Sequence, residues 1–369
     1  MQEYEQGALD VFLVKVRADF DAVVNQAAAS MSALEKCSIL GSSPLADALF
    51  TKVSANTFEG MRAVWRHVAT TGVKDLGTRK AGGLYPETEF IRTWETAVFD
   101  PNQQTADQVV IPEERDWKEA NMYKEALNRG QKIALKMRRE ILQDPFEVFN
   151  LAFTLPTDYP NVRFFGKGNR GLDGNFTPLN ERYISTQHAR ADGGATQSNA
   201  VLSSGNAMVF SETAFWAARE LGYTFKDDVG DDDPRMTGSV TLVAPNYGGI
   251  LKVAKQLNDS EWAIETAENQ INVHRGAIVS VKSHPALLAS RYNPTISNPN
   301  QWFLIDEVVR DPEVGTNLEC IEFVPQQMKV ERLNPNDSIV FKGKQEYCYG
   351  WTDWRNGVGT PGTGTTYTG

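Results

Sequence analysis

The sequence predicts an α+β protein, and three observations support that prediction. A long helical pattern fills the stretch from Pro112 to Pro145, and two β-rich segments precede it. Further along, short apolar strands alternate with a helix over residues 239–324. The 369 residues, of which 41% are hydrophobic, can form a substantial core in one large domain or two modest ones.

The chain begins with a helical pattern in residues 3–35. Apolar residues there recur at spacings of three and four, which is the period of one helix face. Both a helix and a partner-binding arm remain open as interpretations of this segment. Gly41 and Pro44 then interrupt the pattern.

Two β-rich segments flank a glycine-rich, cationic turn region. Residues 61–68 and 89–99 have the composition and alternation of strands, and residues 70–83 lie between them. An isolated two-stranded hairpin is only marginally stable in water. The sequence therefore predicts a long two-stranded hairpin that something else covers, such as a neighbouring subunit.

Basic and aromatic residues of this hairpin stand out because the whole chain carries a net charge of −10. One interpretation is an ordinary solvated hairpin. The other is an electrostatic complement to an acidic surface of an identical neighbour, anchored by two tryptophans. The candidate contact residues are Trp65, Arg66, Lys74, Arg79, Lys80, Arg92 and Trp94.

The long helix is predicted over residues 113–143. Pro112 suits the first turn, and the acidic residues that follow face the positive end of the helix dipole. Basic residues lie towards the other end, and Pro145 is expected to end the helix, because the residue before a proline avoids the α region. Apolar residues recur at spacings near three, four and seven, so one face is expected to be buried. Gly130, near the middle, is predicted to allow a bend.

Beyond this helix, the expected elements are shorter. Residues 161–198 are rich in glycine and are expected to form a loop-rich insertion. A second helix is predicted over 204–221, with Gly222 as the glycine that follows its last turn. Residues 226–236 form an acidic loop.

The C-terminal third is predicted to be mostly strands. Residues 339–354 alternate between apolar and polar side chains, which predicts a half-buried strand. The tail at 357–369 is rich in glycine and threonine and is expected to be loose. The preceding elements are a strand at 239–244, a helix at 245–257, and strands at 279–281, 301–306 and 317–324.

Candidate chemical sites are few. The four histidines lack metal-ligand spacing, and the three cysteines are widely spread, which favours reduced thiols. The segment 166–171 resembles a phosphate loop but lacks the GK[ST] ending. The five aspartates in 227–233 could hold Ca²⁺, yet their spacing differs from an EF-hand, so a solvated acidic loop is the default interpretation. We therefore predict no catalytic residue, no cofactor and no metal.

The charge and the hydropathy pattern limit the partners. The negative net charge argues against a general nucleic-acid binder, because such proteins are usually basic. No stretch approaches the ~18 consecutive apolar residues of a membrane span. The first five residues are acidic in character, unlike a signal peptide. No membrane partner is expected.

The order of these elements resembles the major capsid proteins of tailed bacteriophages, which share the Hong Kong 97-type fold, including the Mu-like head subunits. Residues 199–219 and 242–254 look like the stretch where those proteins enter their axial domain. Residues 300–305 are similar to a buried strand of that family, and residues 341–357 to its closing strand. The resemblance covers about 60 to 357 and depends on order and spacing.

The resemblance implies a division of the chain into five parts. In that fold, an arm and an extended loop reach from the subunit towards its neighbours. The parts are an N-terminal arm at 1–59, an E-loop (an extended β-hairpin) at 60–112, a peripheral domain with the spine helix and the insertion at 113–237, an axial domain at 238–338, and a closing strand with the C-terminal tail at 339–369.

The resemblance also implies a function without catalysis. Copies of the chain would assemble in the host bacterial cytoplasm into hexamers and pentamers of an icosahedral shell, the virion capsid, around double-stranded DNA that is not bound sequence-specifically. A separate scaffold protein, a portal protein and, as an optional addition, a decoration protein are the implied partners. Some family members crosslink a lysine to an asparagine of the next subunit. Lys74 and Lys80 lie near the expected loop tip, but no matching asparagine and acid are found, so no crosslink is predicted.

Two alternatives remain open. The first is an encapsulin-like compartment around a cargo enzyme, which the insertion at 161–198 disfavours because encapsulins usually lack it. The second is a carboxylate-dependent hydrolase assisted by calcium at 227–233, in which Asp231 would be essential.

Overall fold

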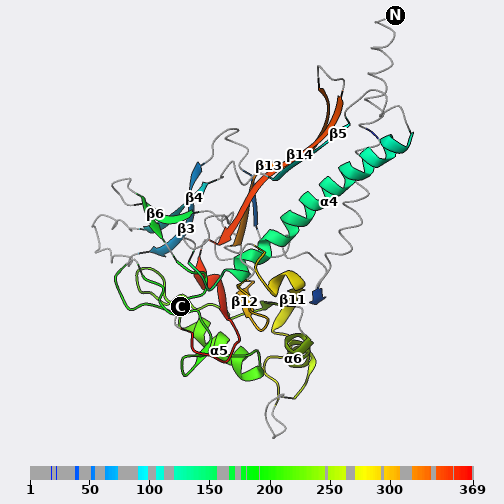
Figure 1. The fold of residues 1–369 in the computed structure, drawn as a ribbon. Helices are drawn as coiled ribbons and strands as arrows, with labels where there is room; N and C mark the ends of the chain where they lie inside the picture. The colour runs from blue at the N-terminus through cyan, green and yellow to red at the C-terminus, as the bar shows by residue number, and fades with distance from the viewer. Residues whose placement is uncertain are drawn as a thin grey trace, which may run out of the picture.

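The computed structural model is organised around one long helix and three main sheets (Figure 1). Apart from two isolated positions near the N-terminus, the structure describes residues 38–40, 51–54, 63–73, 90–98, 105–111, 120–155, 166–170, 176–179, 181–190, 192–245, 248–262, 271–291, 295–307, 318–333, 338–351 and 353–367. The predicted helix at 3–35 lies outside these residues. The mixture of helices with largely antiparallel sheets confirms the α+β class.

A five-stranded central sheet forms the core. Every residue of β10 and β12, two of its three inner strands, is buried, which requires cover on both faces of the sheet. Strands β10 and β11 are parallel, and the other pairs are antiparallel. In order across the sheet, the strands are β1 (Ser38–Leu40), β11 (Ile278–His284), β10 (Val240–Pro245), β12 (Trp302–Asp306) and β15 (Gly357–Thr360).

Strand β15 corrects two predictions. The strand that closes the central sheet is β15 and not the segment 339–357, and the tail that begins at Gly357 is not loose, because β15 is buried along its length. Its glycines serve close packing: a Cβ on Gly359 would lie 2.5 Å from a ring carbon of Phe303. Near the end of the tail, the Tyr367 hydroxyl donates a hydrogen bond to the Ile184 carbonyl at 2.8 Å, which holds this part of the tail against the protein.

Two shorter helices pack against this sheet. Helix α5 (Glu212–Tyr223) contacts β15, and helix α6 (Gly248–Asp259), predicted at 245–257, contacts β11. Ser211 begins α5, because its Oγ accepts a hydrogen bond from the Ala214 N–H at 3.0 Å. Such a cap satisfies one of the N–H groups that the first helical turn leaves unpaired.

The predicted start of α5 at residue 204 is wrong. Residues 202–207 instead form a small hairpin, in which Leu202–Ser203 (β8) pairs with Asn206–Ala207 (β9). Ser204 and Gly205 make its turn with φ angles of 50° and 79°, in the left-handed region.

The predicted end of α5 is also wrong. Gly222 lies inside the helix, and Thr224 is the residue that caps it. A Cβ on Gly222 would lie 2.6 Å from the Met236 Cγ. The glycine is therefore explained by close packing against Met236, and not by a left-handed turn after the helix.

Helix α4 (Ala120–Asn150) is the long helix, and its C-terminal end differs from the prediction. It continues through Pro145, and the basic residues in its middle are not in its last turn. A proline inside a helix removes one hydrogen bond and costs about 3 kcal/mol. Residues 144–150 are all buried, and this packing outweighs the local preference. Gly130 is buried inside the continuous helix, and its role as a bend point stays a prediction. The first part of the predicted helix, residues 113–119, lies outside the described residues.

A second sheet runs beside α4. Figure 1 shows α4 alongside strands β13, β14 and β5, with the central sheet at its C-terminal end. Strand β13 extends the predicted strand at 317–324 by a further nine residues to Leu333. In order, the sheet consists of β2 (Thr51–Ser54), β13 (Leu318–Leu333), β14 (Ser338–Trp351) and β5 (Thr105–Ile111).

The third sheet contains the predicted hairpin. Its two strands are paired antiparallel, as predicted, but the hairpin is not two-stranded. Two strands from the insertion at 161–198 extend it, so this insertion is partly strand, and the segment resembling a phosphate loop is one of its strands. In order, the sheet consists of β3 (Ala63–Val73), β4 (Phe90–Val98), β6 (Gly166–Arg170) and β7 (Phe176–Leu179).

Candidate functional site

The C-terminal turns of α4 hold two buried carboxylates that tie the helix to both neighbouring sheets. The Asp144 Oδ1 accepts a hydrogen bond from the Arg291 Nη1 at 2.8 Å, and the Asp144 Oδ2 accepts one from the Tyr347 hydroxyl at 2.6 Å. Arg291 follows the central-sheet strand β11, and Tyr347 lies on β14. One carboxylate therefore connects the helix to both.

Glu147 lies one turn further along α4. Its Oε2 accepts from the Ser290 hydroxyl at 2.6 Å, and its Oε1 accepts from the Arg291 N–H at 3.0 Å. Burial raises the pKa of the Glu147 carboxyl above its ordinary value, and the negative charge of Asp144 adds to this rise. The hydrogen bonds from its neighbours act in the opposite direction but do not cancel it.

Asn150 ends the helix, and its side chain bonds to one backbone segment and to one other side chain. Its Nδ2 donates to the Ala286 carbonyl at 2.8 Å, and its Oδ1 accepts from the Gln301 Nε2 at 2.9 Å. The same Gln301 nitrogen donates to the Leu287 carbonyl at 2.7 Å. The segment after β11 is therefore fixed against the helix by side chains on both sides of it.

His284 completes this contact. Its ring stacks on the Phe146 ring with the centroids 4.5 Å apart and 13° between the planes. We call the contact between α4 residues 144–150 and residues 284–291 the α4 joint. Its polar and aromatic groups fix the orientation of a long rod relative to the central sheet.

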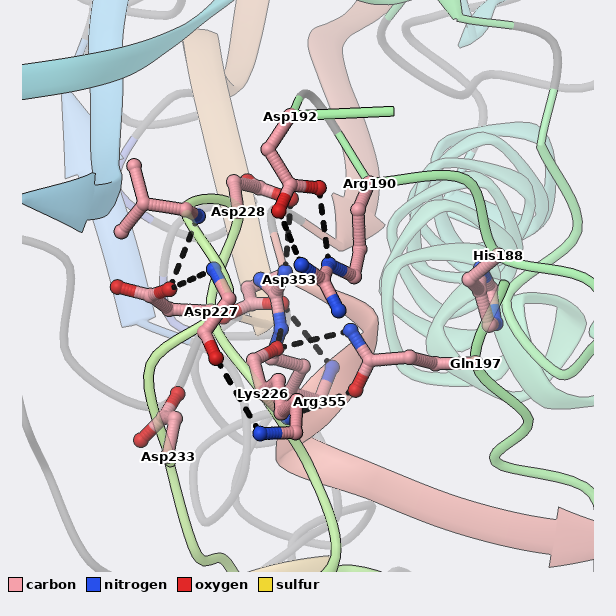
Figure 2. Close-up of polar contacts among 12 residues, drawn as sticks. His188, Arg190, Asp192, Gln197, Lys226, Asp227, Asp228, Asp233, Asp353 and Arg355 are labelled. Atoms are coloured by element: carbon pink, nitrogen blue, oxygen red, sulfur yellow. Dashed lines mark hydrogen bonds and ion pairs between the residues drawn. The ribbon is translucent and has the colours of Figure 1, made fainter. Parts of the chain in front are cut away.

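The acidic loop forms a second polar cluster, shown in Figure 2. The Asp227 Oδ1 accepts hydrogen bonds from three successive backbone N–H groups, each at 2.9 Å, so the loop organises its own turn. The Arg355 Nη2 donates to the Asp228 Oδ1 at 2.8 Å, and the Arg355 Nη1 donates to the Asp353 Oδ1 at 3.1 Å. The Arg355 side chain is only 2% exposed, so this cation is buried with its partners.

Two further arginines extend the cluster. The Arg235 Nε donates to the Asp233 Oδ2 at 2.9 Å, and the Arg190 Nε donates to the Asp192 Oδ1 at 3.0 Å. Figure 2 shows polar groups of three segments of the chain lying together, around residues 188–197, 226–233 and 353–355. The hydrogen bonds and ion pairs of this cluster therefore connect loops that are distant in sequence.

This arrangement changes the interpretation of the acidic loop. The aspartates that face the protein are paired with arginines or with backbone N–H groups, so the loop is more than a solvated segment. Among the residues that the structure describes, no three His, Cys, Asp or Glu side chains are grouped to hold a metal ion. The geometry supports structural cohesion better than ion binding.

His188 and Asn199 are central residues that the sequence did not single out as a site. The His188 ring is fully buried and stacks on Trp354 at 4.1 Å with 2° between the planes. The Asn199 Nδ2 donates to the carbonyls of Tyr183, Trp354 and Gly357 at 2.8 to 3.2 Å. All these partners but one lie far away in sequence, so no local pattern could have revealed them.

The predicted contact residues fall on or near the third sheet. Trp65 and Arg66 lie on β3, and Arg92 and Trp94 lie on β4. The pairing places Trp65 opposite Thr96 and Trp94 opposite His67, so the two tryptophans lie two pairs apart on one ribbon. The cations at positions 74, 79 and 80 lie outside the described residues. The proposed contacts with a neighbour stay predictions.

Exposed apolar side chains gather near α5 and the segment before β11. Ile271 is 76% exposed, Val273 is 73% exposed and Trp216 is 47% exposed. Trp216 contacts the ring of His274, which follows Val273 directly, with 4.9 Å between the ring centroids.

In the described part of the chain, no helix combines the length and apolar character needed to cross a bilayer.

Comparisons with known proteins give likenesses of structure only. No protein-family model and no curated protein sequence matches the chain. The capsid of the cyanophage P-SCSP1u is 11% identical, with a TM-score of 0.45, over 86% of this chain and 87% of that one. The capsid of Ralstonia phage GP4 is 13% identical, with a TM-score of 0.42, over 89% and 90%.

A third similar structure is a virus-like particle from Pyrococcus furiosus. It is 11% identical, with a TM-score of 0.37, over 95% of this chain and 99% of that one. With identities this low and TM-scores below 0.5, these likenesses do not by themselves assign a role to this chain.

Proposed function

We propose that the chain is the major capsid protein of a tailed bacteriophage, a shell subunit without catalysis. The observation that carries the proposal is the arrangement of α4. At about 1.5 Å per residue, its 31 residues form a rod of roughly 46 Å that leaves the central sheet at the α4 joint. The β13–β14 hairpin follows it outward (Figure 1). Elements that reach so far from the central sheet are available to contact other copies, and neighbouring subunits would cover the surfaces that they leave exposed.

The parts of the chain then have distinct roles. Residues 1–59 form the N-terminal arm, and residues 60–112 form the E-loop, which lies over the next subunit with Trp65 and Trp94 as anchors. The peripheral domain at 113–237 contains the spine helix, and the axial domain at 238–338 surrounds the symmetry axes.

The exposed apolar surface supports self-association. Large exposed apolar side chains that gather on one surface mark sites of protein interaction more often than scattered ones do. Ile271 and Val273 lie in the proposed axial domain, where copies would meet in rings of five and six, and Trp216 of α5 contacts the neighbouring His274 from the peripheral domain. Burial there would stabilise the rings by about 25 cal/mol per Å² of apolar area.

The partners follow from this role. A separate scaffold protein would guide assembly in the host cytoplasm, a portal protein would occupy one vertex, and a decoration protein is an optional addition. The net charge of −10 would limit adhesion of packaged DNA to the shell wall, because binding to DNA depends mainly on cations that neutralise phosphates.

Electron microscopy of the full chain, expressed with and without a scaffold protein, tests the proposal. We expect rings or closed shells. Monodisperse monomers at high concentration in both preparations would contradict it. Purified shells also separate the alternatives, because nuclease-protected DNA from infected cells supports a phage capsid, whereas a copurifying cargo enzyme supports an encapsulin-like compartment.

A further inference from the structure

His284 links three elements at the α4 joint. It is the last residue of β11, its half-buried ring stacks on Phe146 of α4, and it precedes the short 3₁₀ turn η3 (Pro285–Leu287). The His284 Nδ1 accepts a hydrogen bond from the Ala286 N–H at 3.0 Å. A ring nitrogen that accepts carries no proton, so the ring in this arrangement is the neutral imidazole.

The surroundings of His284 oppose a positive charge. Burial lowers the pKa of the His284 ring, and the charge of Arg139 on α4 lowers it further. Strand β10 places Pro245 opposite His284, and η3 contributes no charged residue. On β11 itself, the charged neighbour is Lys282, whose own pKa is influenced by Glu307.

The anions of the joint are already engaged. The Glu147 carboxylate accepts hydrogen bonds from Ser290 and Arg291, and the Asp144 carboxylate accepts from Arg291 and Tyr347. In the α4 joint, neither of these two carboxylates is hydrogen-bonded to the His284 ring. A proton on the ring would therefore gain no carboxylate partner without rearrangement of these bonds.

We propose that His284 is an acid-responsive latch of the α4 joint. At neutral pH the ring caps η3 through Nδ1 and packs on Phe146. On mild acidification the protonated Nδ1 can no longer accept from the Ala286 N–H, and a cation appears in the half-buried contact near Arg139. The joint then opens, and α4 is freed to move relative to the central sheet. This inference does not depend on the proposed shell function.

Hydrogen exchange of the full-length protein between about pH 7.5 and about pH 5 tests the latch, after correction for intrinsic exchange rates. We expect the amides of residues 144–150 and 284–291 to open at least about five-fold more at the lower pH, the effect of one lost hydrogen bond of ordinary strength. In His284→Asn this response should disappear, because an asparagine oxygen can cap the turn but does not titrate.

Two variants complete the experiment. Arg139→Gln removes an exposed cation that lowers the pKa of the His284 ring in the closed joint, so the difference from the ordinary pKa narrows and acidification should open the joint less than in the wild type. His274→Asn is the matched control, because that buried histidine contacts Phe215 and Trp216 and not α4, and it should leave the response of the joint unchanged. Equal protection at both pH values in the wild type would overturn the proposal. A response that persists in His284→Asn would also overturn it. Should His284→Asn fail to fold, a response in Arg139→Gln as large as that of the wild type would overturn it instead.

Discussion

The Asp144 carboxylate of α4 accepts a hydrogen bond from the hydroxyl of Tyr347 on β14 at 2.6 Å, across 203 residues of sequence. Both side chains are buried. The same carboxylate also binds Arg291, so it holds the long helix, the second sheet and the segment after β11 at one point. The rod is thus anchored at its base by a charge-assisted contact, which is stronger than a neutral hydrogen bond.

Tyr347→Phe should therefore destabilise the chain. The change removes one donor and leaves a buried carboxylate oxygen without it, at a cost of about 1–3 kcal/mol. Chemical denaturation of the variant and of the wild type measures this difference. Tyr223→Phe, at a side chain that is 48% exposed, is the matched control and should change little. Equal loss in the two variants would show that the Asp144 contact is not the cause.

Asn199→Ala should be among the most damaging single changes in the described part of the chain. Its amide group donates to three backbone carbonyls, and its oxygen accepts from the Ser185 N–H at 2.9 Å. Truncation leaves these buried groups unpaired, and we expect a loss of at least about 3 kcal/mol. Thermal and chemical unfolding measure it. Asn206→Ala, at an exposed position of strand β9, should cost far less, and a similar cost at both sites would argue against a special role for Asn199.

The pH dependence of stability should include a contribution from His274. Burial lowers the pKa of this ring below its ordinary value of 6.5, and Arg219 lowers it further, while Glu212 raises it. A depressed pKa means that the unfolded chain binds the proton more readily, so stability is complete above pH 6.5 and is lost as the pH falls through the folded value. His274→Phe should flatten this acid-side loss when unfolding midpoints are compared from neutral to acid pH. A profile as steep as that of the wild type would contradict the assignment.

Regular patterns with a strong period were predictable from the sequence. The long helix, the antiparallel hairpin and the buried strand β12 follow from local spacing of apolar residues, which is preserved whatever the tertiary contacts are. The end of α4 was not predictable, because burial of the turns around Pro145 depends on residues more than 130 positions away, such as Ala286. Local preference for a break after Asp144 is real, and packing overrides it.

The structural roles of two glycines were also not predictable from the sequence. At Gly222 and Gly359 the sequence suggested a helix end and a loose tail, whereas both positions are packed against another side chain with no room for a Cβ. The composition of a segment does not distinguish a glycine needed for flexibility from one needed for close approach. The two polar clusters could not be predicted from composition either. Arg355, for example, contacts Asp228 only after the chain has folded.

The proposed shell function makes a prediction about the exposed apolar surface. Ile271 and Val273 are 76% and 73% exposed, so a charge at either position would have little effect on the folded subunit. If copies of the chain bury this surface against each other, Ile271→Asp with Val273→Asp should abolish rings and shells while the unfolding midpoint of the subunit stays close to that of the wild type. Sedimentation velocity and electron microscopy measure assembly, and thermal unfolding measures the subunit. Thr363→Asp, an exposed position on the C-terminal tail, is the control and should assemble normally. Normal shells from the double variant would remove this surface from the proposed interface.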